Sequence, residues 1–169
     1  MISSSSAEDS MDVFLYHEGL QALGEKLKPE QDNETIKDIV WCLSNIVAGS
    51  ENHRVMFMNE ETILQKVIDL LNYKVWIVQR EAIFVITNLV VSAENNDLIY
   101  HLATTDDYKV LQLLTKCLEA SEKDHETCSE LLQTFDKIFS LDKDYQIPLE
   151  QQFSYKFEDY GGLNILEEL

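Results

Sequence analysis

The chain has 169 residues, of which 45% are hydrophobic, with 13 Lys and Arg against 31 Asp and Glu and a formal net charge of −18. The hydrophobic fraction predicts a folded chain. The negative charge excludes partners with anionic surfaces, so we expect neither a nucleic-acid binder nor a membrane-surface binder. No stretch predicts a transmembrane helix, and the start lacks the pattern of a secretory signal. We therefore expect a protein of the cytoplasm or the nucleus.

The number and positions of prolines and glycines favour helices. Residues 1–10 are Ser-rich and acidic, which predicts a disordered tail, and the domain is expected over residues 11–169. Only two prolines and five glycines occur, too few for a fold with many turns. Pro29 is expected to end one helix, and Asn33 to cap the next.

An apolar stripe at helical spacing recurs three times. It begins between residues 33 and 49, and shifts of 43 and then 49 positions reproduce it. A period in the forties predicts a helical solenoid. The three stripes are Ile36, Ile39, Val40, Leu43, Ile46, Val47; then Gln79, Ala82, Ile83, Ile86, Leu89, Val90; then Cys128, Leu131, Leu132, Phe135, Ile138, Phe139.

Two shorter apolar clusters precede each stripe, which predicts three helices per unit. The alternative is an α/β fold, because the β-branched run at 84–91 is also compatible with a buried strand. Helical spacing that extends upstream to Val75, and the absence of a Gly-rich phosphate loop, favour the all-α fold. The expected units span about residues 11–49, 50–92 and 93–141, with a partial unit at 149–169 after a linker.

The polar face of the first two long helices carries a repeated set of residue types. The first rung, as we call it, is Asp38, Trp41 and Asn45, and the second rung is Glu81, Phe84 and Asn88. Each has an acid, an aromatic and an asparagine at positions i, i+3 and i+7. The third long helix has Glu130, Gln133 and Lys137 at these positions, so the set does not continue.

These residue types suit an extended cationic peptide. An asparagine carboxamide both donates and accepts, so it can pair with a peptide backbone. Aromatic walls hold the stem of Lys or Arg, and the acid meets the charged head. The alternative is structural: the aromatic packs between neighbouring helices, and the asparagine ties one helix to the next unit.

Two segments, WCLSNIVAG at residues 41–49 and EAIFVITN at residues 81–88, resemble the third helices of armadillo repeats in the importin-alpha (karyopherin-alpha) family. The ending FEDYGGLNILE, residues 157–167, is similar to the segment that opens the family's last repeat. The resemblance covers about residues 11–169. It implies a right-handed superhelical solenoid of armadillo repeats, equivalent to the C-terminal part of the family's solenoid with its minor site for nuclear localisation signals.

The resemblance also implies roles and partners. Both rungs correspond to positions that bind Lys/Arg-rich signals in a nuclear-import adaptor, although Phe84 stands where the family has tryptophan. An export receptor or a nucleoporin at the C-terminal region is a further implied partner. We expect no recruitment of importin-beta by the family's route, because residues 1–30 are acidic rather than basic.

Other chemistry finds little support in the sequence. His125 and Cys128 have the spacing of two metal ligands, but no second pair matches them. Cysteines 42, 117 and 128 form no disulfide framework. We therefore expect free thiols, no metal, no cofactor and no enzymatic activity. The alternative function is an armadillo-repeat scaffold that binds proteins but does not act in import.

Overall fold

The computed structural model describes residues 11–14, 18–28 and 30–169, and this part of the chain is helical with no β-strand. None of its helices is both long and apolar enough to cross a membrane. The elements in chain order are α2 (Gly19–Lys26), α3 (Asn33–Val47), α4 (Glu51–Asn59), α5 (Glu61–Leu70), α6 (Trp76–Val91), α7 (Asn96–Ala120), α8 (His125–Asp144), the 3-10 helix η1 (Leu149–Gln151), α9 (Phe153–Asp159) and α10 (Gly162–Glu168).

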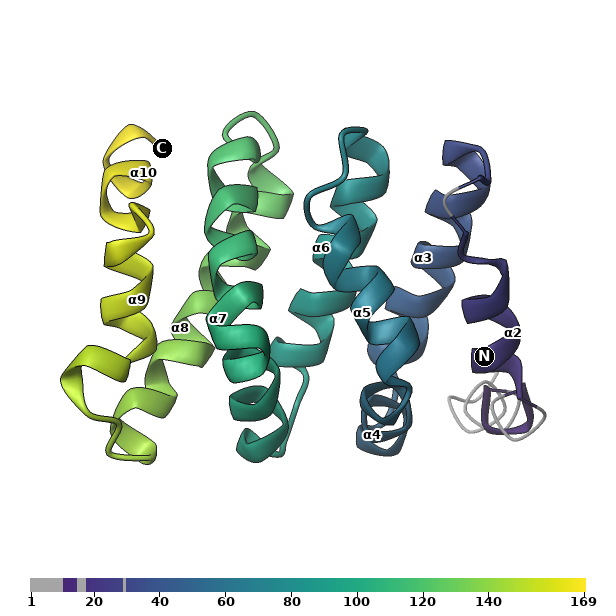
Figure 1. The fold of residues 1–169 in the computed structure, drawn as a ribbon, viewed down its shortest axis with the longest axis horizontal. Helices are drawn as coiled ribbons and strands as arrows, with labels where there is room; N and C mark the ends of the chain where they lie inside the picture. Colours follow the sequence, from purple (N-terminus) through teal and green to yellow (C-terminus); the bar gives the residue numbers. More distant parts are fainter. Residues whose placement is uncertain (1–10, 15–17, 29) are drawn as a thin grey trace, which may run out of the picture.

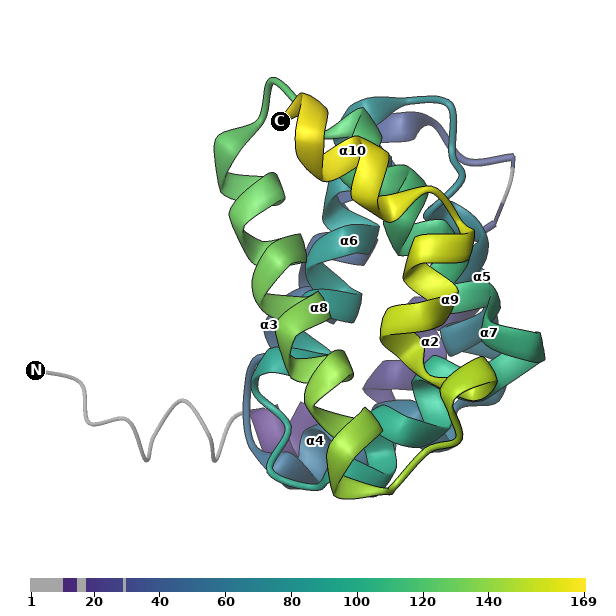
Figure 2. The same ribbon diagram turned by 90° about the vertical axis from the view of Figure 1, so that its left-hand side faces the viewer.

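The helices stand side by side in one row, with α2 at one end and α10 at the other (Figure 1). Seen along the row, α3, α6 and α8 form one layer, while α5, α7 and α9 form the other (Figure 2). Within the first layer α6 packs against α3 on one side and α8 on the other. The all-α prediction is therefore confirmed, and the arrangement is solenoid-like.

The core runs between the two layers along the row. Helix α6 lies in the middle of the row and buries residues on several sides. The β-branched run at 84–91 lies within this helix and forms no strand. Gly24 of α2 lies so close to Ile63 of α5 that a Cβ at this glycine would be 2.5 Å from the Ile63 side chain. This contact brings α2 and α5 together.

Two details differ from the sequence prediction. Asp32, not Asn33, caps α3: its Oδ1 accepts a hydrogen bond from the backbone N–H of Thr35 at 3.0 Å. That bond lowers the pKa of the Asp32 carboxyl. Leu132, assigned to the third apolar stripe, is 40% exposed. The disordered tail predicted at 1–10 lies outside the described residues.

Helix α7 is divided by a sharp kink. Thr105 is extended, and Asp106, Asp107 and Tyr108 have φ values of 49°, 53° and 64°, in the left-handed region. Such backbone is costly for residues other than glycine. The Tyr108 hydroxyl donates to the carbonyl of Gln151 at 3.2 Å. The kink yields two helical segments before α8, in keeping with two predicted clusters.

Candidate functional site

Helices α3 and α6 carry the six predicted residues on neighbouring positions of one layer. Together these residues form what we call the candidate face: Asp38, Trp41, Asn45, Glu81, Phe84 and Asn88. The two helices make the most extensive contact in the molecule as described. All six residues are exposed or half-buried, so none is sealed in the core.

Trp41 is the most open large side chain of the candidate face, with 55% of its surface exposed. Its carbonyl accepts hydrogen bonds from the Ser44 hydroxyl and from Asn45 Nδ2, both at 2.8 Å. The Asn45 amide donor is therefore engaged by its own helix. Within the described residues no hydrogen bond reaches Asn45 Oδ1, which leaves an acceptor for a ligand N–H.

A hollow of about 590 Å³ lies beside Trp41. None of its lining residues comes from α6, so it opens towards the N-terminal elements rather than towards Phe84. An apolar lining of this kind suits a hydrocarbon side chain or the stem of a lysine. The lining residues are Met11, Phe14, Leu23, Trp41, Cys42, Asn45 and Ile46.

The ring of Phe84 already has a cation over it. The guanidinium carbon of Arg80 lies 4.6 Å from the ring centroid. Arg80 also reaches α8, where its Nε is 2.9 Å from Asp124 Oδ2 and its Nη2 is 2.5 Å from Glu126 Oε2. Arg80 is not among the site residues predicted from the sequence. Its position one helical turn before Phe84 was the available signal.

The acids of the two rungs differ in exposure. The side chain of Asp38 is 71% exposed, with the Lys37 ammonium 3.3 Å from Oδ1. The side chain of Glu81 is 15% exposed. Burial raises the pKa of Glu81, and the positive charges of Arg80 and Lys37 oppose that shift without cancelling it. A carboxylate in this state gains from any further cation that approaches it.

Asn88 joins the two helices. Its Nδ2 donates to the carbonyl of Ser44 on α3 at 3.2 Å. Asn88 therefore ties one helix to the next unit, as the structural alternative predicted. Its Nδ2 is then engaged and does not donate freely to a peptide carbonyl. The second rung is therefore engaged through its asparagine as well as its aromatic ring.

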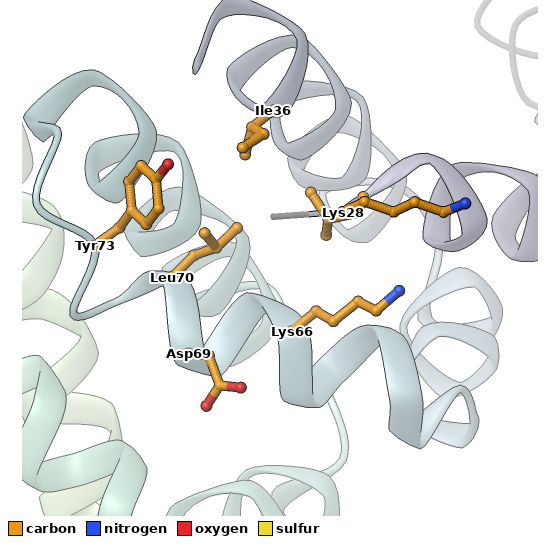
Figure 3. A pocket seen from close by; sticks show the side chains of 7 residues that line it. Lys28, Ile36, Lys66, Asp69, Leu70 and Tyr73 are labelled. Atoms are coloured by element: carbon orange, nitrogen blue, oxygen red, sulfur yellow. The ribbon is translucent and has the colours of Figure 1, made fainter. Parts of the chain in front are cut away.

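A second hollow, of about 270 Å³, lies away from the candidate face and contains none of its residues. Lys28 and Lys66 extend their ammonium groups towards the same side of it (Figure 3). The Lys66 ammonium donates to the carbonyl of Gly24 at 2.7 Å. Among the described residues no three His, Cys, Asp or Glu side chains gather as metal ligands would.

Comparisons with known proteins bear on the fold. Neither a scan against family models nor a search of curated proteins found a match. Among solved structures, the chain is similar to two crystal structures of engineered proteins, both targets of the Northeast Structural Genomics Consortium. One has a TM-score of 0.66 and 22% identity, covering 89% of this chain and 54% of its own. The other has a TM-score of 0.65 and 24% identity, covering 89% and 55%.

The chain thus spans about half the length of the structures it matches. At this level of identity the likeness shows the fold alone. It defines the chain as an all-helical protein with a solenoid-like arrangement of helices.

Proposed function

We propose that the chain is an armadillo-repeat adaptor of the importin-alpha kind, which binds extended Lys/Arg-rich peptides and moves between cytoplasm and nucleus. The observation that carries this proposal is Trp41, whose indole lies exposed on α3 between an open carboxylate and an asparagine. The indole also lines the apolar hollow with Met11, Phe14 and Leu23, so it belongs to an exposed apolar patch. Exposed apolar patches with polar neighbours mark binding surfaces, which supports a ligand at this position.

The first rung supplies the contacts that such a peptide needs. The stem of a lysine or arginine lies against Trp41, and the charged head lies over the ring or reaches Asp38. Asn45 Oδ1 accepts from a backbone N–H. Each of these contacts contributes on the order of 0.5–2 kcal/mol, so useful affinity requires several residues of the ligand.

The charge of the whole chain supports the same ligand class. A net charge of −18 produces a field that draws cationic peptides in and raises their association rate. The field is screened by salt over about 10 Å at 0.1 M. Binding of a basic peptide is therefore expected to weaken as salt concentration rises.

The test is a titration followed by fluorescence anisotropy of a labelled lysine-rich peptide. The control peptide has norleucine at each lysine, which keeps the stem and removes the charge. We expect salt-sensitive binding of the lysine peptide alone. This binding is expected to weaken in Trp41→Ala and to be kept in Tyr155→Ala, a matched exposed aromatic on α9. Equal affinity for both peptides would reject the adaptor function.

A second candidate function is a scaffold for apolar peptide segments, without a role in import. It is favoured by the hollow beside Trp41, where Met11, Phe14 and Leu23 offer an apolar rather than an anionic lining. A scaffold of this kind binds the norleucine peptide at least as well as the lysine peptide. Leu23→Asp would abolish that binding, whereas an adaptor that reads charge would keep its lysine peptide.

A further inference from the structure

Arg80 covers the ring on which the second rung depends. Its guanidinium carbon is 4.6 Å from the centroid of Phe84, inside the distance at which a cation is attracted to an aromatic face. A basic side chain of a ligand that stacks on this face would meet the arginine. The chain's own arginine therefore stands where a ligand's lysine or arginine would lie.

The carboxylates around Arg80 hold it in this position. Asp124 and Glu126 approach its Nε and Nη2 at 2.9 and 2.5 Å, and Glu81 lies 3.9 Å from its Nη1. Asp124 is fixed in turn, because it caps α8 by accepting from the N–H of Thr127 at 3.1 Å. The guanidinium thus donates charge-assisted bonds to Asp124, the cap of α8, and to Glu126 in its first turn, which favour its place over the ring.

In the first rung the corresponding cation, Lys37, pairs with carboxylates rather than with the aromatic ring. Lys37 precedes Trp41 by one turn, as Arg80 precedes Phe84, but its ammonium pairs with Glu34 at 2.6 Å and with Asp38 at 3.3 Å. These partners lie on its own helix. Trp41 retains an exposed surface of 55%, so the first rung is open and the second is filled.

We propose that Arg80 is a resident occupant of the second rung and sets the specificity of the candidate face, so that a bound peptide places only one basic side chain, at Trp41. This inference rests on the proposed function for its meaning. The second rung then adds surface and negative charge to the candidate face, but it offers no place for a basic side chain of the peptide. Removal of Arg80 opens a second slot made of Phe84, Glu81 and the carboxylates of Asp124 and Glu126.

The peptide test compares wild type with Arg80→Ala. Two labelled peptides are used, one with a single arginine and one with two arginines three residues apart, a spacing of about 10 Å in an extended chain. Wild type is expected to bind both within about twofold of each other. Arg80→Ala is expected to bind the two-arginine peptide about fivefold more tightly than wild type does, the scale of one cation–π contact, and to leave the other within about twofold.

Two controls distinguish the effect of opening the ring from the effect of removing one positive charge. Lys116→Ala makes the same change in net charge at an exposed site on α7, and is expected to give no selective gain. Arg80→Ala combined with Phe84→Leu removes the ring, and is expected to abolish the gain. No selective gain in Arg80→Ala, or a gain that survives the loss of the ring, overturns the proposal.

A second readout needs no peptide and so separates this inference from the proposed function. Ethylguanidinium at millimolar concentration is added during thermal unfolding, with ethylammonium as the matched control. Arg80→Ala, or Arg80→Met if the alanine variant does not fold, is expected to gain about 1–2 °C from ethylguanidinium relative to wild type. If neither variant gains, the site does not accept a free guanidinium and Arg80 is not an occupant in the sense proposed.

Discussion

Helices α3 and α6 carry the same residue types at the same spacing, yet they present them differently. On α3 the Trp41 indole is 55% exposed, and among the described residues Asn45 bonds only within its own helix. On α6 the Phe84 ring lies under Arg80, and the Asn88 amide is bonded to α3. The same pattern therefore gives one rung free for a ligand and one already engaged.

The reason is the position of each helix in the row. Helix α6 has α3 on one side and α8 on the other, and both supply partners for its polar side chains. Helix α3 has such a neighbour in its layer on the α6 side, and its other side borders the hollow at Met11 and Phe14. Periodicity places a side chain on a face, but the neighbouring unit decides whether that side chain is available.

The largest expected difference between the rungs is in peptide binding. Trp41→Ala should weaken binding of a lysine-rich peptide about tenfold, because it removes the open ring and about 1.4 kcal/mol of contact. Phe84→Ala should change the same affinity by less than about twofold, because Arg80 already covers that ring. Isothermal titration calorimetry of both variants measures the two effects, and equal losses would contradict the asymmetry.

For the free energy of unfolding, the second rung should matter more than the first. The comparison is between Arg80, beside Phe84, and Lys37, beside Trp41. Arg80→Ala should cost about 1 kcal/mol in the free energy of unfolding, because it leaves Asp124 and Glu81 without their partner. Lys37→Ala should cost less than Arg80→Ala, because its ion pairs are at the surface of one helix. Urea unfolding followed by circular dichroism compares them. A larger cost for Lys37→Ala is the contrary outcome.

The two asparagines provide a matched pair of variants. Asn88→Ala should cost about 0.5–1 kcal/mol, since it removes a hydrogen bond that joins α6 to the Ser44 carbonyl. Asn45→Ala should change stability by a few tenths of a kcal/mol, because its donor serves an exposed carbonyl of its own helix. The same urea unfolding curves decide this. Indistinguishable variants would mean that Asn88 does not tie the helices together.

The smallest effect concerns Glu81 and pH. Burial raises its pKa in the folded protein, so the folded state holds the proton more tightly than the unfolded chain does. Stability is then reduced as pH rises from the ordinary glutamate range through the folded pKa. Glu81→Gln should gain stability relative to wild type between pH 4 and pH 7. A relative loss over that range would show that the Arg80 charge outweighs burial.

Much of the fold was accessible from the sequence because it depends on local periodicity. The stripe at Val40, Leu43 and Val47 identified the buried face of α3 correctly. The third stripe wrongly predicted that Leu132 is buried. Spacing shows which residues share a helix face but not how far a neighbouring helix covers that face. The cap of α3 was misplaced by one residue, since Asp32 and Asn33 are both good capping residues.

The candidate face was predictable only in part. The angular position of Trp41 indicated that it lies away from its helix's apolar stripe, and the structure places it at the surface. The occupancy of the second rung was not accessible. Arg80 meets Asp124 and Glu126, which are 44 and 46 residues further along the chain. Their approach depends on how neighbouring units stack, which no local pattern specifies.

Whether the first rung holds the ligand can be measured from the emission of Trp41 during peptide binding. Trp76→Phe leaves Trp41 as the single tryptophan, since the chain has two. We expect a saturable shift to shorter wavelength as the lysine-rich peptide covers the indole, and no shift with the norleucine peptide. Peptide bound by anisotropy with Trp41 emission unchanged would contradict the claim that the first rung holds the ligand.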